Sequence, residues 1–310
     1  MARPKKDRTK KSAKDEAALP FGRSVLEERL AKIIDLLPAA ADYDADLGEA
    51  AHDLRVAARR ATAAMDLFSD WLPTHDRHWL AEQFSRIRGV AGEARDIDVL
   101  FEHWTRETRK ADPAIVVFLL KRLAGERAEA QHPLNKCVSR LKKKKFKKRS
   151  LAIFADMRWH GKGKEPTLAD HAASTLQGFV KDLSKLSKRL HRQPRRAHEL
   201  RILFKRVRYT LELLDPILAP PLAQKLIERI TLLQDRLGNL NDQRAFAKHY
   251  ESWLKKKFPS EVRSHLQTVL NQTQSAADDQ LASIVRDAPT EVARIVTMLR
   301  QIIPGGTKAA

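Results

Sequence analysis

The amino-acid sequence predicts an all-α fold made of two related halves. From Ser24 onward, apolar residues recur three or four positions apart almost everywhere, which is the spacing of one helix face. No stretch alternates polar and apolar residues for long enough to predict a β-strand. Two motifs of the first half also recur in the second half at one fixed offset. We therefore expect helices throughout and an internal duplication.

The repeated motifs are the strongest sign of duplication. HDLRVAARR at residues 52–60 corresponds to HELRILFKR at residues 198–206. GEARD, which contains Gly92, corresponds to GNLND, which contains Gly238. The offset is 146 residues for both motifs, without a gap. Two separate motifs at one offset predict that an entire helical unit is repeated.

Composition shifts divide the chain into five expected segments. Residues 1–18 are basic and almost free of large apolar side chains, so we expect a disordered tail. The two helical repeats are expected at residues 19–155 and 167–303. Between them, residues 156–166 contain two glycines and a proline and are expected to form a linker. A flexible C-terminus is expected at residues 304–310.

The first helix is predicted by four apolar residues. Leu26, Leu30, Ile33 and Leu37 are spaced three or four positions apart. Pro38 follows directly, and a proline lacks the backbone N–H that continues a helix. We therefore expect this helix to end at Pro38.

Charge narrows the possible partners. The 310 residues include 59 Lys and Arg against 39 Asp and Glu, a formal net charge of +20. Such an excess repels itself, so it indicates an anionic partner such as nucleic acid, an anionic membrane surface or a phosphate polymer. No apolar run approaches the roughly 18 residues of a membrane span, and we expect no membrane partner. A single cysteine, Cys137, excludes an internal disulfide and is typical of a reducing cytoplasm.

The first repeated motif forms a cationic stripe on each of two predicted helices. At roughly 100° per residue, the basic residues of each copy share one side and the apolar residues lie opposite. Few acidic residues interrupt the stripes, and arginine, whose planar fork suits phosphate oxygens, dominates them. Solvated helix faces are the ordinary alternative, but the repetition favours anion binding. The stripes comprise His52, Arg55 and Arg59, with Arg60 flanking, and His198, Arg201, Lys205 and Arg208, with Arg206 flanking.

A histidine heads each stripe. Surrounding cations disfavour protonation of an imidazole, whereas a bound polyanion favours it. We therefore expect His52 and His198 to donate to phosphate and to gain charge when it binds. A structural role is the common alternative. Metal binding is a weaker one, because neither histidine has a further Cys or His ligand three or four positions away.

The second motif and a lysine-rich run add candidates. Asp96 and Asp98 could be magnesium ligands, but Arg244 stands where the second copy would repeat Asp98. Ion pairing of Asp96 and Asp242 with basic side chains is therefore the favoured interpretation, with Arg95 beside the site. Residues 142–149 (KKKKFKKR) lie within an apolar pattern and are expected to be helical. From this run, Lys145 and Arg149 are the members expected to reach the site.

These motifs resemble those of the CHAD family, the conserved histidine α-helical domain. The resemblance rests on HDLRVAARRATAAMDLF with GEARDIDVL, and on HELRILFKRVRYTLELL with LQDRLGNLND. It implies two bundles of about four helices each, related by a pseudo-two-fold axis, with a basic groove between them. It also implies binding of inorganic polyphosphate and recruitment to polyphosphate granules. The β-rich triphosphate tunnel domain that some members carry has no counterpart here.

Carried over motif by motif, the resemblance places polyphosphate binding on the two stripes. Thr62 stands where the second copy has Arg208, so unequal contributions are expected. The expected function is thus non-catalytic polyphosphate binding without a cofactor, in the cytoplasm or at granules. Non-specific binding of a nucleic-acid backbone is the leading alternative. A metal-dependent polyphosphate hydrolase and a scaffold for an acidic protein are weaker ones.

Overall fold

A computed structural model describes residues 17–42, 49–107, 112–190 and 192–304. In these ranges the chain is helical, and the one β-type contact is an isolated bridge between Ala17 and Thr167. The all-α prediction is confirmed. The predicted basic tail, apart from Ala17 and Ala18, and residues 305–310 of the predicted C-terminus lie outside the described residues.

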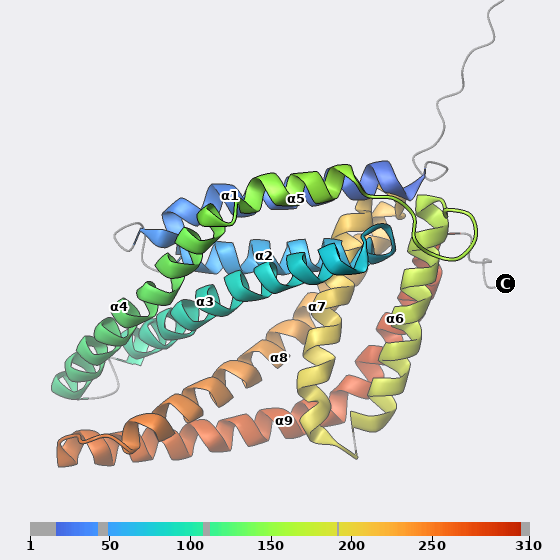
Figure 1. Cartoon of the computed structure of the whole chain (residues 1–310). Helices are drawn as coiled ribbons and strands as arrows, with labels where there is room; N and C mark the ends of the chain where they lie inside the picture. The colour runs from blue at the N-terminus through green and yellow to red at the C-terminus, as the bar shows by residue number, and fades with distance from the viewer. Residues whose placement is uncertain (1–16, 43–48, 108–111, 191, 305–310) are drawn as a thin grey trace, which may run out of the picture.

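Nine α-helices occupy the described part of the chain (Figure 1). The half before the linker contains α1 (Ala18–Ala41), α2 (Glu49–Leu67), α3 (Thr74–Glu107), α4 (Pro113–Lys143) and α5 (Phe146–Ala155). The other half contains α6 (Leu168–Leu190), α7 (Ala197–Leu214), α8 (Pro220–Leu254) and α9 (Ser260–Ile302). The first repeated motif lies on α2 and α7, and the second lies on α3 and α8.

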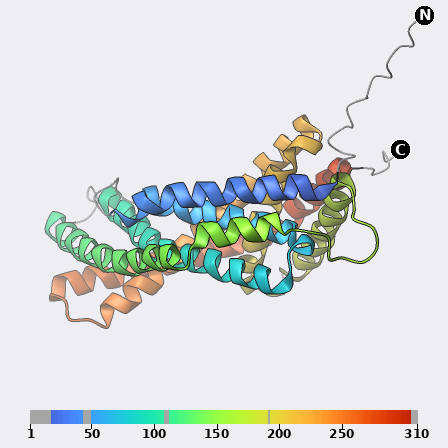
Figure 2. The same cartoon turned by 45° about the horizontal axis from the view of Figure 1, so that its top comes forward.

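The longest helices extend as two arms. Helices α3 and α4 run side by side to one end of the molecule, and α8 and α9 run to the same end below them (Figure 1). The shorter helices α1, α2 and α5 cover the base of the first arm, while α6 and α7 stand at the base of the second. The view in Figure 2 shows α1 and α5 lying along the same face.

The main hydrophobic core is continuous across both halves. Helix α2 contributes an alanine-rich face, on which Ala58, Ala61 and Ala64 are fully buried. Helix α7 contributes larger side chains to the same cluster, including the fully buried Leu200 and Phe204. Small residues let neighbouring helix backbones approach closely, and α2 packs directly against α7. This contact holds the polar faces of the two motif helices next to one another.

Helix α1 does not end at Pro38, contrary to the sequence prediction. It continues to Ala41, with Pro38 in its last turn. Ala40 in this turn is buried in the core, and its carbonyl oxygen accepts a hydrogen bond of 3.0 Å from Gln131 Nε2 of α4. Burial and this tertiary hydrogen bond stabilise the turn beyond the proline.

The lysine-rich run is helical as expected except at residues 144–145, where the helix is interrupted. Helix α4 ends at Lys143, and α5 begins at Phe146. Between them Lys145 adopts a left-handed backbone conformation with φ of 50°, which is uncommon for a residue with a side chain. The break turns the chain so that Phe146 is buried in the core, 2% exposed. Packing of Phe146 thus outweighs local helix propensity.

The linker between the halves is folded against the short 3-10 helix η2 (Ser69–Trp71). The indole Nε1 of Trp71 donates to Glu165 Oε1 at 2.8 Å, and Trp159 packs on the same indole with ring centroids 4.8 Å apart. The backbone N–H groups of Arg158 and His160 donate to the carbonyls of Trp71 and Asp70. The connection is therefore part of the packed structure.

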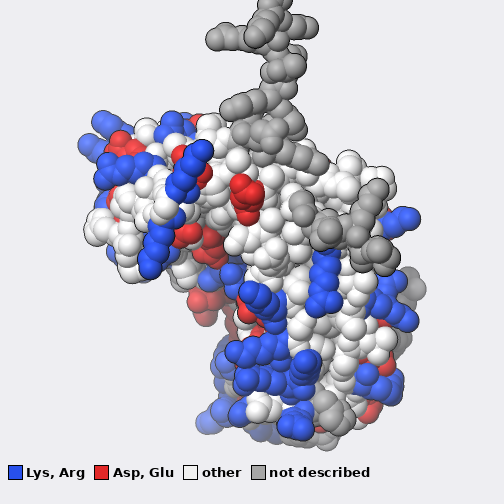
Figure 3. Space-filling view, turned by 90° about the vertical axis from the view of Figure 1, so that its right-hand side faces the viewer, with Lys and Arg blue, Asp and Glu red and all other residues white. Residues whose placement is uncertain are grey.

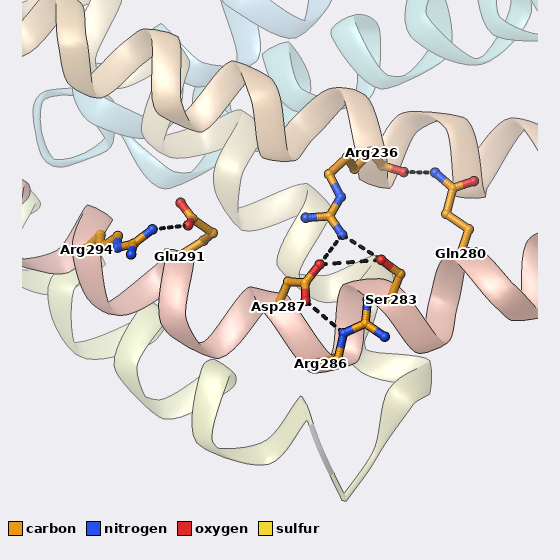
Figure 4. A network of polar contacts seen from close by, with 7 residues as sticks. All are labelled: Arg236, Gln280, Ser283, Arg286, Asp287, Glu291 and Arg294. Carbon is orange, nitrogen blue, oxygen red and sulfur yellow. Dashed lines mark hydrogen bonds and ion pairs between the residues drawn. The ribbon is translucent and has the colours of Figure 1, made fainter.

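Arg236 joins α8 to α9 (Figure 4). Its Nη2 atom donates to Asp287 at 2.8 Å and to Ser283 at 3.0 Å, while its carbonyl oxygen accepts from Gln280 at 2.7 Å. Hydrogen bonds from Arg236 and Arg286 lower the pKa of Asp287. This arginine of the second motif therefore has a structural partner in α9.

The arm tips meet in a second apolar cluster. Trp104 of α3 and Leu119 of α4 pack with Tyr250 and Trp253 of α8, among other residues. Glu126 of α4 lies beside this cluster and accepts a hydrogen bond of 2.9 Å from the Trp253 indole. The cluster ties the ends of the two arms together.

Glu126 collects further partners from both arms. His249 Nε2 lies 2.9 Å, Arg122 3.1 Å and Lys256 3.4 Å from its carboxylate oxygens. Burial alone would raise the pKa of Glu126, but hydrogen bonds from His249 and Trp253 and the charges of His249 and Lys256 lower it to about 2. The ionised carboxylate is thus strongly favoured in the folded protein.

We expect Glu126 to stabilise the arms in a pH-dependent way. Because its pKa is lower in the folded than in the unfolded chain, the stabilisation is present above about pH 4.5 and is lost as the pH falls toward 2. Glu126→Ala should lower the free energy of unfolding at pH 7 by about 2–3 kcal/mol, since it leaves several donors without their acceptor. Urea denaturation at pH 7 and pH 3 measures this. A loss that is equal at both pH values would contradict it.

Candidate anion-binding site

Five basic side chains from α2 and α7 form what we call the central basic cluster. Its members are Arg55 and Arg59 on α2 and Arg201, Lys205 and Arg208 on α7. The apolar faces of both helices enter the core, and this directs the basic faces toward a shared region. Positive charges from the two halves therefore converge, in line with the basic groove that the family resemblance implied.

The convergence of positive charge has a large effect on the pKa of Lys205. Burial of its ammonium group and the positive charges of its neighbours lower its pKa from 10.5 to about 7. The contributing charges are those of Arg59, Arg201, Arg55 and Arg208, in decreasing order. In the free protein, a neutral Lys205 is therefore well populated at neutral pH.

The arginines of the cluster also repel one another. Burial and the charge of Arg55 lower the pKa of Arg59 to about 10, although a hydrogen bond with Tyr209 opposes the shift. Burial likewise lowers the pKa of Arg201, against the opposing charge of Asp242. The fold thus holds cations closer together than their mutual repulsion favours.

Two equivalent arginines retain unpaired donors. The Nε atoms of Arg55 and Arg201 are both buried and have no hydrogen-bond partner. Arg55 Nε lies against Gly92 of the second motif, where an added Cβ would come within 3.4 Å of it. A buried N–H without an acceptor is costly, so the packing of α2 and α7 holds both guanidinium groups in place at an energetic cost.

The acidic residues of the second motif behave as ion-pairing groups. Asp96 Oδ1 lies 2.9 Å from Arg55 Nη1, which confirms the ion pair predicted for this residue. Asp98 pairs with Arg127 of α4 at 2.7 Å. Burial raises the pKa of Asp242, while Asn241 and the charge of Arg201 oppose the rise. Asp96 and Asp242 therefore lie near equivalent arginines, one from each half.

The two histidines lie at the starts of their helices, and both are exposed. Partial desolvation of the imidazole and the positive charge of Arg95 lower the pKa of His52, while Asp53 opposes the shift. The charges of Arg59 and Arg55 lower it further. His52 thus adjoins the central basic cluster, and His198 lies one helical turn before Arg201.

Three other predicted residues have partners outside the cluster. Arg60 Nη2 lies 3.4 Å from Glu212 of α7, and Arg95 Nη1 lies 2.7 Å from Glu102. Arg206 points toward α6, with its guanidinium carbon 5.8 Å from the Phe179 ring centroid. The structure therefore brings Arg60 and Arg95 to the edge of the site and turns Arg206 away from it.

Lys145 and Arg149 are not brought to the cluster. Helix α5 packs mainly against α1 and α4. The Arg149 guanidinium lies 4.1 Å from the centroid of the Trp79 ring at the start of α3. Lys145 is the N-cap residue of α5. The run has other neighbours because the break at Lys145 redirects α5.

The sequence interpretation missed Glu212 beside the cluster and a second basic surface. Tyr209, 5% exposed, hydrogen bonds with Arg59, and Glu212 lies between Arg60 and Arg208. Figure 3 shows Lys and Arg gathered over the end of α6 and the turn into α7. Exposed members of this segment include Lys185, Lys188, Arg189, Arg192 and Arg195. Their density in the sequence would have been sufficient to find them.

Within the described ranges, no group of three or more His, Cys, Asp or Glu side chains is arranged to hold a metal ion. Nor does any helix there combine the length and apolar character needed to cross a bilayer.

The sequence profile of the CHAD domain matches residues 24–251, which is most of the chain. The chain belongs to the CHAD family. Both motif helices, α2 and α7, lie inside the matched region. A search of curated proteins found no match.

Two solved structures share the fold of this CHAD protein. The CHAD domain from the plant Ricinus communis superposes with a TM-score of 0.66 at 18% sequence identity, covering 94% of each chain. PptA from Streptomyces chartreusis superposes with a TM-score of 0.59 at 15% identity, covering 91% of this chain and 98% of its own. At these identities, the similarity establishes the common helical architecture.

Proposed function

We propose that the protein binds inorganic polyphosphate at the central basic cluster without breaking a bond. The observation that carries the proposal is the convergence of five basic side chains from α2 and α7, which belong to opposite halves. Burial and the charges of the neighbouring arginines lower the pKa of Lys205 to about 7. A chain of phosphates would supply the negative charge that this site needs.

Binding would be electrostatic. Each phosphate brought to the cluster releases counterions from the polymer, so affinity should fall as salt is added. Rigid helices hold the cluster in place, and this limits the ordering cost of binding. The basic surface at the end of α6 and the turn into α7 precedes His198 in the chain. It would offer further contacts to a long polymer (Figure 3).

Nucleic acid is the principal competitor, because its backbone offers similar phosphates. Single-strand binding commonly uses exposed aromatic rings for base stacking. The aromatic side chain within the cluster, Tyr209, is buried and hydrogen bonds with Arg59. This favours a polymer that has phosphates and no bases.

A competition assay tests the preference. Labelled long-chain polyphosphate bound to the protein should resist displacement by single-stranded RNA at equal phosphate concentration and equal salt. We expect unlabelled polyphosphate to compete at least about tenfold better than RNA, since each further good contact is worth roughly that factor. Equal competition would identify a general polyanion-binding protein instead.

Non-catalytic binding is tested separately. Asp96 is paired with Arg55 and Asp98 with Arg127, so both carboxylates already have partners. Incubation with polyphosphate and magnesium should therefore release no phosphate. Release that is abolished by Asp96→Ala would overturn this part of the proposal and indicate a hydrolase. Granule recruitment in the cell would follow from binding of the polymer that forms granules.

A further inference from the structure

The lysine-rich run and the end of α4 form a further basic surface, away from the central basic cluster. Residues 130–155 contain nine Lys and Arg and no Asp or Glu. Helix α5 lies along the top of the molecule in Figure 1, whereas α7 lies below α2. We call six exposed cations of this stretch the lysine surface, namely Lys136, Arg140, Lys143, Lys144, Lys147 and Lys148.

The basic residues of α4 share one face of the helix. Lys136, Arg140 and Lys143 follow one another at four and three positions, which places them in a row with about 5–6 Å between neighbours. Together with His132 they line the same surface recess. Val138, on the other side of the helix, is buried in the core. The packing of α4 therefore presents the row to the outside.

The row continues onto α5 across the break at Lys145. Figure 2 shows the two helices meeting there, and Phe146 anchors the junction in the core. Lys147 and Lys148 follow in the first turn of α5, and both are exposed. The first turn of a helix is its positive end, so cations there are unfavourable and a bound anion is favourable. Helix stability thus does not account for these lysines.

The lysine surface has no neutralising partners in the described part of the chain. None of its six side chains has a carboxylate oxygen within 4.0 Å there. The ion pairs of α4 are made by Arg122 and Arg127, which lie earlier in the helix. Like charges gathered without acids repel one another, and a polyanion relieves that repulsion.

The neighbouring side chains favour a chain of phosphates over nucleic acid or a membrane. Trp79 is nearly buried with the Arg149 guanidinium 4.1 Å from its ring centroid, and Phe146 is 2% exposed, so neither ring is free to stack on a base. Helix α5 buries Ile153 and exposes Leu151. One exposed leucine does not make the apolar face with which a helix enters a bilayer.

We propose that the lysine surface binds a second segment of polyphosphate, so that one protein molecule bridges two polymer chains. The choice of ligand rests on the function proposed above. The residues are separate from the central basic cluster and on a different side of α2. The two sites can therefore fail separately.

A sandwich assay tests the bridge. Long-chain polyphosphate is fixed to beads, protein is bound at low salt, unbound protein is washed away, and fluorescent polyphosphate is added. The unaltered protein should capture the fluorescent polymer. Glutamine at positions 143, 144, 147 and 148 should leave the protein on the beads and reduce capture at least about tenfold, because four of six phosphate contacts are lost. Arginine at the same four positions should retain capture, since it retains the charge.

The matched control removes four scattered lysines and so the same net charge. These exposed residues lie on α1, α4 and α8, and the substitutions are Lys32→Gln, Lys121→Gln, Lys225→Gln and Lys248→Gln. The control should capture as much polymer as the unaltered protein. Because all the exchanged side chains are exposed, the thermal unfolding midpoint should not change in any variant, and this checks the fold.

Undiminished capture by the glutamine variant of the lysine surface, or an equal loss in the control, would overturn the bridge. Release of the captured polymer by single-stranded RNA at equal phosphate concentration would overturn the choice of polyphosphate and indicate a general polyanion surface. The central site fails separately if Arg55→Ala with Arg201→Ala binds the beads normally and the glutamine variant does not. No retention of the unaltered protein would overturn both sites.

Discussion

Simultaneous Arg55→Ala and Arg201→Ala substitution is expected to weaken binding of long-chain polyphosphate about 100-fold. Each change removes a charged donor whose Nε atom is buried without a partner in the free protein. A hydrogen bond between charged groups contributes about 1.5–3 kcal/mol, so each arginine accounts for roughly a tenfold change. The slope of log affinity against log salt should also become shallower by about two, one unit for each lost phosphate contact.

The control for this experiment removes the same net charge elsewhere. Arg86 is paired with Glu82 on α3, and Arg294 is paired with Glu291 on α9. Replacing both with alanine should reduce affinity by no more than about threefold, through the weaker long-range field alone. Fluorescence anisotropy across a salt series measures both variants. If the control loses as much affinity as the cluster variant, then overall charge, and not the cluster, governs binding.

The second large effect is a pH dependence centred on Lys205. Its pKa is about 7 in the free protein, whereas a bound polyanion favours the ammonium form and raises the pKa toward its ordinary value. Above pH 7, binding therefore takes up a proton, and affinity falls as the pH rises. For one such group we expect a loss of about 30-fold between pH 7 and pH 9.

Lys205→Arg isolates this group, because arginine remains charged across that interval. The variant should bind almost equally well at pH 7 and pH 9. A slope that persists in Lys205→Arg would assign the titration to another residue. Any additional gain in affinity between pH 8 and pH 6 is expected to come from His52, and His52→Gln tests this contribution.

The same pKa shift affects stability in the opposite direction. Lys205 has a lower pKa folded than unfolded, so between about pH 7 and pH 10.5 the unfolded chain binds more protons. Folding then becomes more favourable as the pH rises through this interval. Charge repulsion in the cluster therefore weakens the free protein at neutral pH, and a bound polyanion relieves it.

Sequence periodicity was sufficient for the helices and for the two cationic faces. Apolar spacing places Leu200 and Phe204 opposite Arg201 and Lys205, so burial of one face necessarily directs the other. The motif also predicted an ion pair of Asp96 with a basic side chain, since Asp96 is repeated in the second copy as Asp242, and the structure gives Arg55 as the partner. The helices and their faces depend on local geometry, which the sequence of a single chain displays directly.

Features that depend on packing between distant segments were missed. The neighbours of Arg206 depend on how α6 lies beside α7, and the position of Arg149 depends on the break between α4 and α5 at Lys145. Helix α1 passes Pro38 because Gln131, 93 residues later, hydrogen bonds with its last turn. The large pKa shift of Lys205 arises from burial and from four arginines on two helices, and no spacing rule gives their separation.

The main core has a consequence for how this molecule can change. Because α2 and α7 bury their apolar faces in one continuous hydrophobic core, the two halves share this core. Each half therefore stabilises the fold of the other half, and the linker joins them because Trp159 packs on Trp71. Whether a core substitution in one half is tolerated thus depends on side chains of the other half, which are distant in the sequence. We accordingly expect the core residues of the two halves to change together during evolution.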